Sequence, residues 1–122
     1  MSYSFSRLQE WAEGEPIGDS GLVACCVSGR LDSVSSDDAE KRLLELLEAG
    51  VRGYVVDLSA LDFLASAGLR VLLVLARRLS AGSGVVVLVA PKPEVLQVLE
   101  LSGMVGVLKV CPDRAAARAL LG

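Results

Sequence analysis

Ser66 is the residue whose type and position could best support chemistry. It follows an apolar run and a short acidic loop in the segment 54–75, YVVDLSALDFLASAGLRVLLVL. We expect a helix to begin at Ser66, which places its hydroxyl at the positive end of the helix dipole, beside backbone N–H groups without helical partners. A phosphate on Ser66 would be stabilised there, so the segment predicts a phosphorylatable switch. The alternative is a helix N-cap worth about 1 kcal/mol and nothing more.

Other chemistry is restricted by what the sequence lacks. The chain has no histidine, which excludes Ser-His-Asp and Cys-His catalysis and the common zinc sites that use His. Its cysteines, Cys25, Cys26 and Cys111, lack CxxC spacing and are expected to be small buried side chains. Loop carboxylates such as Asp32 and Asp57 form a weak Mg²⁺ signal and serve equally well as caps and turn formers. We therefore expect no enzyme, no metal and no cofactor.

Composition favours one α/β domain over residues 1–122. The chain is 52% apolar but only 4% aromatic, so its core must be built from Leu, Val and Ala. Net charge is −3 and the basic residues are scattered, which argues against nucleic acid as a partner. We expect neither a signal peptide nor insertion into a membrane, because Met1 is followed by polar residues and no apolar run is long enough. A cytoplasmic location fits the poor disulfide framework.

The elements that position Ser66 follow from periodicity and turn residues. Residues 3–10 and 22–28 resemble an antiparallel pair of strands, and a helix from Ser36 to about Gly50 follows. Residues 51–58 and 84–90 are Val-rich strands that flank a helix over 66–79, which predicts a right-handed parallel crossover. A helix from Pro93 to Gly103, a strand near 107–110 and a helix from Pro112 complete the chain. This order predicts an α/β fold with a mixed, mostly parallel sheet.

The helix after Ser66 carries more apolar residues than one face can hold. We expect Leu69, Leu72, Leu73, Ala76 and Leu79 to face the sheet, and Val71, Val74 and Leu75 to form a second apolar row. Either a neighbouring part of the chain covers this row, or it is a surface for a partner or for a homodimer. Arg70, Arg77 and Arg78 would surround it.

Three motifs together resemble the STAS domain of bacterial anti-sigma factor antagonists. They are Gly29-Arg30-Leu31-Asp32, Asp57-Leu58-Ser59 at the end of a Val-rich strand, and the run from Phe63 to Leu69, and the likeness continues through PEVLQVLELSGM. The resemblance implies phosphorylation of Ser66 by an anti-sigma factor that is a serine kinase. It also implies that Asp32 and Asp57 lie close to Ser66. Together with the apolar residues around Ser66 and the second apolar row, this predicts a partner-binding surface composed of Asp32, Asp57, Leu64, Ala65, Ala67, Gly68, Leu69, Arg70, Val71 and Val74.

The sequence departs from that family pattern at Ala65, where members often carry Asp. The change alters the field around a phosphate and removes a possible contact to a kinase. Two other functions remain open. One is a constitutive STAS accessory subunit of a membrane ABC transporter complex. The other is a receiver phosphorylated on Asp57, which has a weaker basis because Asp32 supplies only one acid and Lys109 lies within its strand.

Overall fold

The structure is a computed structural model that describes residues 3–12, 15–18, 21–47, 50–103 and 108–121. Its strands are β1 (Tyr3–Arg7), β2 (Glu10–Ala12), β3 (Glu15–Pro16), β4 (Leu22–Leu31), β5 (Gly53–Asp57), β6 (Leu61–Leu64), β7 (Val85–Val89) and β8 (Lys109–Cys111). Its helices are α1 (Ser36–Glu45), α2 (Ser66–Ser80), α3 (Pro93–Leu101) and α4 (Arg114–Leu121).

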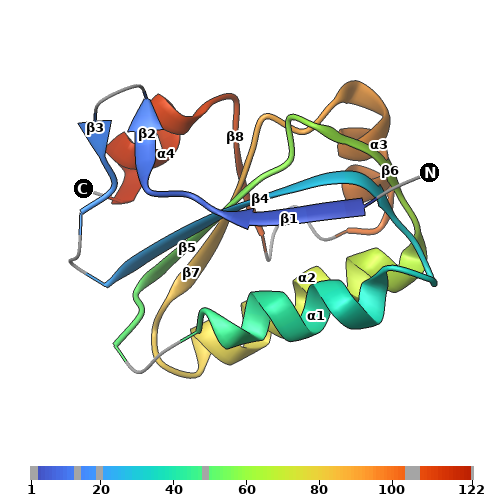
Figure 1. The fold of residues 1–122 in the computed structure, drawn as a ribbon, viewed down its shortest axis with the longest axis horizontal. Helices are drawn as coiled ribbons and strands as arrows, with labels where there is room; N and C mark the ends of the chain where they lie inside the picture. The colour runs from blue at the N-terminus through green and yellow to red at the C-terminus, as the bar shows by residue number, and fades with distance from the viewer. Residues whose placement is uncertain (1–2, 13–14, 19–20, 48–49, 104–107, 122) are drawn as a thin grey trace.

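The main sheet has the order β1-β4-β5-β7-β8, and β6 pairs with the far half of β4 (Figure 1). Only the β1–β4 pair is antiparallel, and the other described pairs of this sheet are parallel. The predicted α/β class with a mixed, mostly parallel sheet is confirmed. Because β4 is long, its start pairs Leu22 with Gly53 of β5 and its end pairs Leu31 with Leu64 of β6. This arrangement brings the end of β4 to the start of α2.

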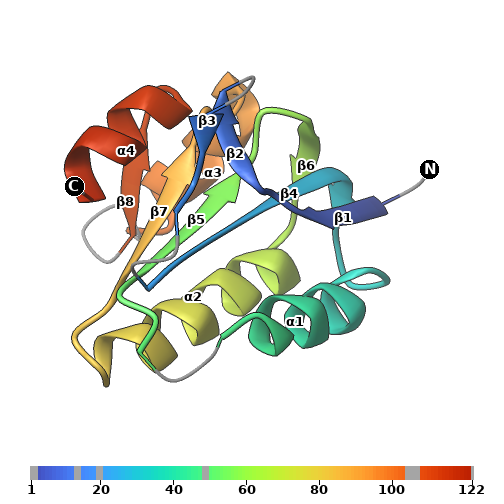
Figure 2. The ribbon, with the colours of Figure 1, turned by 60° about the vertical axis from the view of Figure 1, so that its left-hand side comes forward.

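Helices pack on both faces of the sheet. Buried residues of α1, α2 and α3 form one core with side chains such as Tyr54 and Val56 of β5. Val55 points to the opposite face and packs with Trp11, Ala117 and residues of α4. Figure 2 shows α1 and α2 side by side on one side of the sheet and α4 on the other. Alternation along β5 therefore directs consecutive side chains into different cores.

The second apolar row predicted on α2 is covered by the protein itself. Val71 and Leu75 are each 1% exposed and belong to the same core as Ala39 and Leu43 of α1. A partner surface that includes Val71 is therefore wrong, because this core already buries the residue. Val74 and Leu73 are half-buried, so Leu73 does not face the sheet as expected.

Several boundaries differ from the prediction. The strands β2, β3 and β6 were not expected, and each has four residues or fewer. The first helix ends at Glu45 rather than near Gly50, and the last begins at Arg114 rather than Pro112. The Asp113 carboxylate accepts the N–H of Ala116 at 2.8 Å and so caps α4. The helix therefore begins two residues after the predicted start. The predicted strand at 107–110 appears as Lys109–Cys111, with residue 107 outside the described residues.

Candidate functional site

Ser66 is the first residue of α2, and its side chain is exposed. The N-cap is Ala65, whose backbone is extended at φ −93° and ψ 172° and whose side chain makes no capping hydrogen bond. The interpretation of Ser66 as the N-cap is therefore wrong by one residue. Since Ser66 is the first residue of the helix and not its N-cap, its hydroxyl does not serve as the helix cap.

The first backbone N–H groups of α2 lie at the same helix end as this hydroxyl. The first helical hydrogen bond runs from the Leu69 N–H to the Ala65 carbonyl at 3.0 Å, so the amides of Ser66, Ala67 and Gly68 precede the helical ladder. The first turn of α2 contains no acidic residue. The positive end of the helix dipole is therefore uncompensated by local charge.

The start of α2 is held against the end of β4. The Ala65 N–H donates to the Leu31 carbonyl at 3.0 Å, and Leu31 and Leu64 are neighbours in the sheet. A Cβ on Gly68 would lie 2.7 Å from Leu64 Cδ1 and 2.9 Å from the Leu31 carbonyl oxygen. Glycine is therefore required where α2 crosses β4, and both Gly68 and Leu64 are buried.

Burial divides the predicted partner surface into two groups. Leu64, Gly68, Val71 and Asp57 lie inside the protein and present almost no surface to a partner. Ser66 and Arg70 are exposed, and Ala65, Ala67, Leu69, Val74 and Asp32 are half-buried. The accessible part of the predicted surface is thus the solvent side of α2 and the turn after β4.

Asp32 forms that turn. Its carboxylate accepts the Val34 N–H at 3.0 Å and the Ser35 N–H at 3.2 Å, and its own N–H donates to the Ser35 hydroxyl at 3.0 Å. Arg30 Nε lies 3.6 Å from the second carboxylate oxygen. The hydrogen bond from the Ser35 amide, with those of Val34 and the charge of Arg30, lowers the pKa of Asp32. Asp32 follows Leu31 directly, so its turn lies at the same sheet edge as Ser66.

Asp57 lies on the opposite face of the sheet from α2. It is 3% exposed, and Arg114 Nε of α4 donates to it at 2.7 Å. Burial acts to raise the pKa of Asp57, but hydrogen bonds from Ser59 and Arg114 outweigh burial and lower it. Arg114 also donates to the backbone carbonyls of Glu10 and Trp11 at 3.2 and 3.3 Å. Asp57 therefore joins β5, α4 and the N-terminal strand β2, and it does not meet Ser66.

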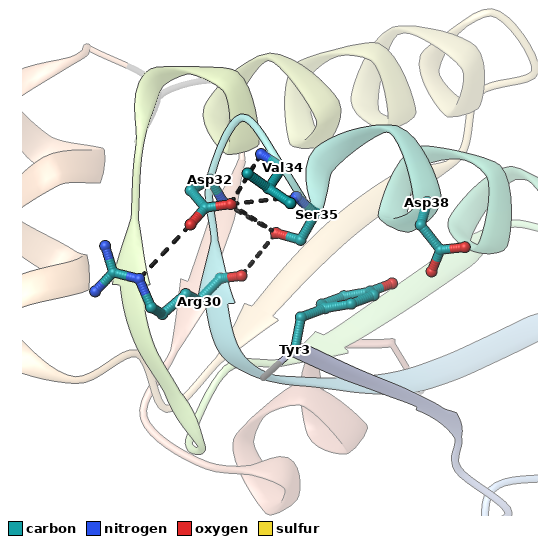
Figure 3. A pocket seen from close by; sticks show the side chains of 6 residues that line it. All are labelled: Tyr3, Arg30, Asp32, Val34, Ser35 and Asp38. Carbon is teal, nitrogen blue, oxygen red and sulfur yellow. Dashed lines mark hydrogen bonds and ion pairs between the residues drawn. The ribbon is translucent and has the colours of Figure 1, made fainter. Parts of the chain in front are cut away.

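Sequence reasoning missed the side chains that border the turn. The Arg30 guanidinium carbon lies 4.0 Å from the centre of the Phe63 ring, and Phe63 and Val34 are 39% and 89% exposed. A cavity of about 560 Å³ opens beside them, lined by Tyr3, Arg30, Asp32, Val34, Ser35 and Asp38 (Figure 3). The signal available in the sequence was the aromatic Phe63 next to Asp62, in a segment that was expected to be a loop and is strand β6. Burial and the Asp38 carboxylate raise the pKa of Tyr3 to about 12.

Within the described residues, no cluster of three potential ligand residues could hold a metal ion. Over the same part of the chain, no helix is long and apolar enough to cross a membrane. Cys25, Cys26 and Cys111 are free thiols, and burial raises the pKa of each. They are therefore poor nucleophiles at neutral pH.

Comparison with known proteins places this fold and site in one class. Residues 18–117 match the family model described as "STAS domain". The chain belongs to the STAS domain family, as its motifs predicted. The buried Asp57, at the end of β5, forms an ion pair with Arg114. We therefore do not retain the interpretation of the chain as a receiver phosphorylated on Asp57.

Three similar proteins define the class further. A protein of Bordetella bronchiseptica named "Putative anti-sigma factor antagonist BtrV" is 37% identical over 99 residues, which cover 81% of this chain and 85% of that protein. The crystal structure of an anti-sigma factor antagonist from Mycobacterium paratuberculosis has a TM-score of 0.77 at 26% identity, covering 98% of this chain and 96% of that one. The unphosphorylated form of SpoIIAA shares the fold, with a TM-score of 0.70 at 20% identity over 98% and 97% of the two chains. These proteins are named for a regulatory role and not for an enzymatic reaction.

Proposed function

We propose that this chain is an anti-sigma factor antagonist that docks to an anti-sigma factor serine kinase, and that phosphorylation of Ser66 ends this docking. The observation that carries the proposal is the exposed Ser66 hydroxyl at the first position of α2, outside the capping role. Support also comes from the relatives in Bordetella and Mycobacterium, which are named as antagonists of this kind.

The transfer needs no catalytic group from this chain. The kinase aligns the γ-phosphate of ATP with Ser66 Oγ, a new O–P bond forms, and the bond from the γ-phosphorus to the bridging oxygen breaks to release ADP. The hydroxyl proton passes to a base of the kinase. The amides of Ser66, Ala67 and Gly68 then lie beside the phosphate, which stabilises the product locally.

The phosphate acts on the partner and not on the fold. It adds a charge of about −1.5 to −2 at a surface where Ala65, Ala67 and Leu69 are only half-buried. A partner packed on these side chains would have to desolvate the phosphate dianion. The free-energy penalty of that desolvation exceeds the free energy gained from the apolar contact. Docking therefore ends while the domain stays folded.

The test uses the purified chain, ATP and an anti-sigma factor serine kinase encoded by the same organism. Mass spectrometry should find one phosphate on Ser66, and Ser66→Ala should remove it. Binding measured by calorimetry should be lost in the phosphorylated protein and in Ser66→Glu. The matched control is Ser6→Glu, an exposed serine on the edge strand β1, which should bind as the wild type does.

Two results would contradict the proposal. If the phosphate is found on a residue other than Ser66, or on none, Ser66 is not the phosphorylated switch. Binding that is indifferent to Ser66→Glu would instead favour a constitutive accessory role, such as that of a transporter subunit.

A further inference from the structure

The solvent side of α2 carries an ordered row of residues that begins at Ser66. Arg70 lies four positions after Ser66, Leu73 and Val74 lie three and four positions after Arg70, and Arg77 lies four and three positions after these two. The five residues therefore lie on one side of the helix, which we name the α2 stripe. The opposite side holds the buried residues Gly68, Leu72, Leu75, Ala76 and Leu79. The stripe places two half-buried apolar side chains between two exposed arginines.

The charge of this stripe is not balanced by the protein. α2 contains Arg70, Arg77 and Arg78 and no acidic residue. Among the described residues, no carboxylate lies within ion-pair distance of these arginines, although Arg42, Arg114 and Arg118 each pair with one at 3.0 Å or less. A cationic face on a chain of net charge −3 is therefore a local feature and not a result of composition.

The helix dipole explains only part of the pattern. Arg77 and Arg78 lie in the last turn, where positive charge is favourable. Arg70 lies in the N-terminal half of α2, one turn after Ser66, where the dipole offers a cation no stabilisation. The dipole therefore does not account for Arg70, whose charge is exposed to solvent and open to a partner.

We propose that the α2 stripe docks an acidic surface of the anti-sigma factor kinase, with Arg70 and Arg77 facing carboxylates and Leu73 and Val74 packing between them. This inference rests on the proposed function and specifies the partner's chemistry. It also gives the switch an electrostatic cause, because a phosphate on Ser66 adds negative charge one helical turn from Arg70. The phosphate then screens the arginine and repels the carboxylates that it would meet.

The experiment measures association of the chain with the same kinase by biolayer interferometry. Charge reversal in Arg70→Glu/Arg77→Glu should lower the association rate by about tenfold or more, while Arg70→Lys/Arg77→Lys should stay within about threefold of the wild type. The control is Arg7→Glu/Lys109→Glu, which makes the same change in net charge on the two edge strands and should change the rate by less than about twofold. Circular dichroism verifies that each variant is folded.

Salt provides a second measurement on the unmodified protein. Raising ionic strength from about 0.1 M to about 1 M shortens the Debye length from about 10 Å to about 3 Å, and should slow wild-type association by about tenfold. The Arg70→Glu/Arg77→Glu variant should lose this dependence. If wild-type association is salt-independent, or if charge reversal matches the control, the acidic docking surface is refuted while Ser66 phosphorylation still supports the proposed function. If neither binding nor phosphorylation occurs, both proposals fail together.

Discussion

At the scale of the single residue, Asp32, Asp57 and Ser66 were predicted to lie in one site but have different roles in the structure. Asp32 closes a turn through hydrogen bonds to the residues that follow it, and Asp57 is locked to Arg114 beneath the surface. Ser66 is exposed at the first position of α2, one residue after the N-cap position. Only Ser66 of these three has a side chain without a structural commitment in the described part of the chain, and it is therefore the residue available for modification.

Asp57 should make stability depend on pH. Its pKa is lower in the folded protein than its ordinary value of 3.8, so its stabilisation is complete above that value and is lost as pH falls through the folded pKa. We expect Asp57→Asn to lower the free energy of unfolding by about 2 to 3 kcal/mol at pH 7, and by less at pH 3. Urea unfolding at both pH values measures this difference.

The control for Asp57 is Asp62→Asn. Asp62 pairs with Lys92 at the surface, where both side chains are largely exposed, so the change should cost less than about 0.5 kcal/mol. An equal loss in the two variants at pH 7 would mean that the Asp57–Arg114 pair does not stabilise the fold.

At the scale of the element, α2 connects the buried structure with the exposed site. Its inner side packs on the sheet and α1, and its first turn lies on the end of β4 through Gly68 and Leu31. The position of Ser66 is therefore determined by a close approach of backbone to backbone. Any residue larger than glycine at this crossing has to displace the helix start.

Gly68→Ala should lower the free energy of unfolding by about 1 to 3 kcal/mol, although alanine is the better helix former. The added methyl group would lie 2.8 Å from Leu31 Cγ and could not be accommodated without moving α2. Gly82→Ala is the matched control, because its nearest neighbour would be 3.8 Å away. Thermal unfolding measures the stability of both variants. If Gly68→Ala leaves the stability unchanged, the crossing of α2 and β4 tolerates a side chain.

The two ends of α2 should respond oppositely to negative charge. Ser66→Asp adds a carboxylate near free N–H groups and should raise the free energy of unfolding by about 0.3 to 1 kcal/mol, whereas Ser80→Asp should lower it by a similar amount. Urea unfolding at low salt measures both, because urea is uncharged and does not screen the dipole. A fall in stability for Ser66→Asp would argue against a favourable environment for a phosphate at this position.

At the scale of the whole molecule, one sheet separates two cores of unequal size. The larger core combines α1, α2 and α3 with one face, and the smaller one combines α4 and β2 with the other. The Arg114–Asp57 pair links β2, β5 and α4 across the smaller core. The site at Ser66 is thus supported by the larger core and lies away from that linkage.

Packing in the larger core should dominate stability. Leu99 of α3 is 1% exposed and Leu101 is 81% exposed, two positions along the same helix. Leu99→Ala should lower the free energy of unfolding by about 3 kcal/mol, and Leu101→Ala should change it by less than about 0.5 kcal/mol. Denaturant titration compares them, and similar losses would place α3 outside the cooperative core.

Local patterns in the sequence were sufficient for most elements. The Val-rich strands, the helix that begins at Ser66 and the helix that begins at Pro93 all follow from periodicity, turn residues and proline chemistry. The short strands β2, β3 and β6 were not predictable, because a pairing of two to four residues is stabilised by its partner strand and not by its own sequence.

The sequence by itself determined the α/β class, the place of Ser66 at a helix start and the family motifs, since each depends on neighbours within a few positions. Tertiary structure alone decided that Asp57 pairs with Arg114, 57 residues away, and that Val71 is buried in the larger core. It also decided which side of α2 is left to solvent. These outcomes depend on which faces of the helices and strands pack together in the folded protein, and no local sequence pattern contains that information.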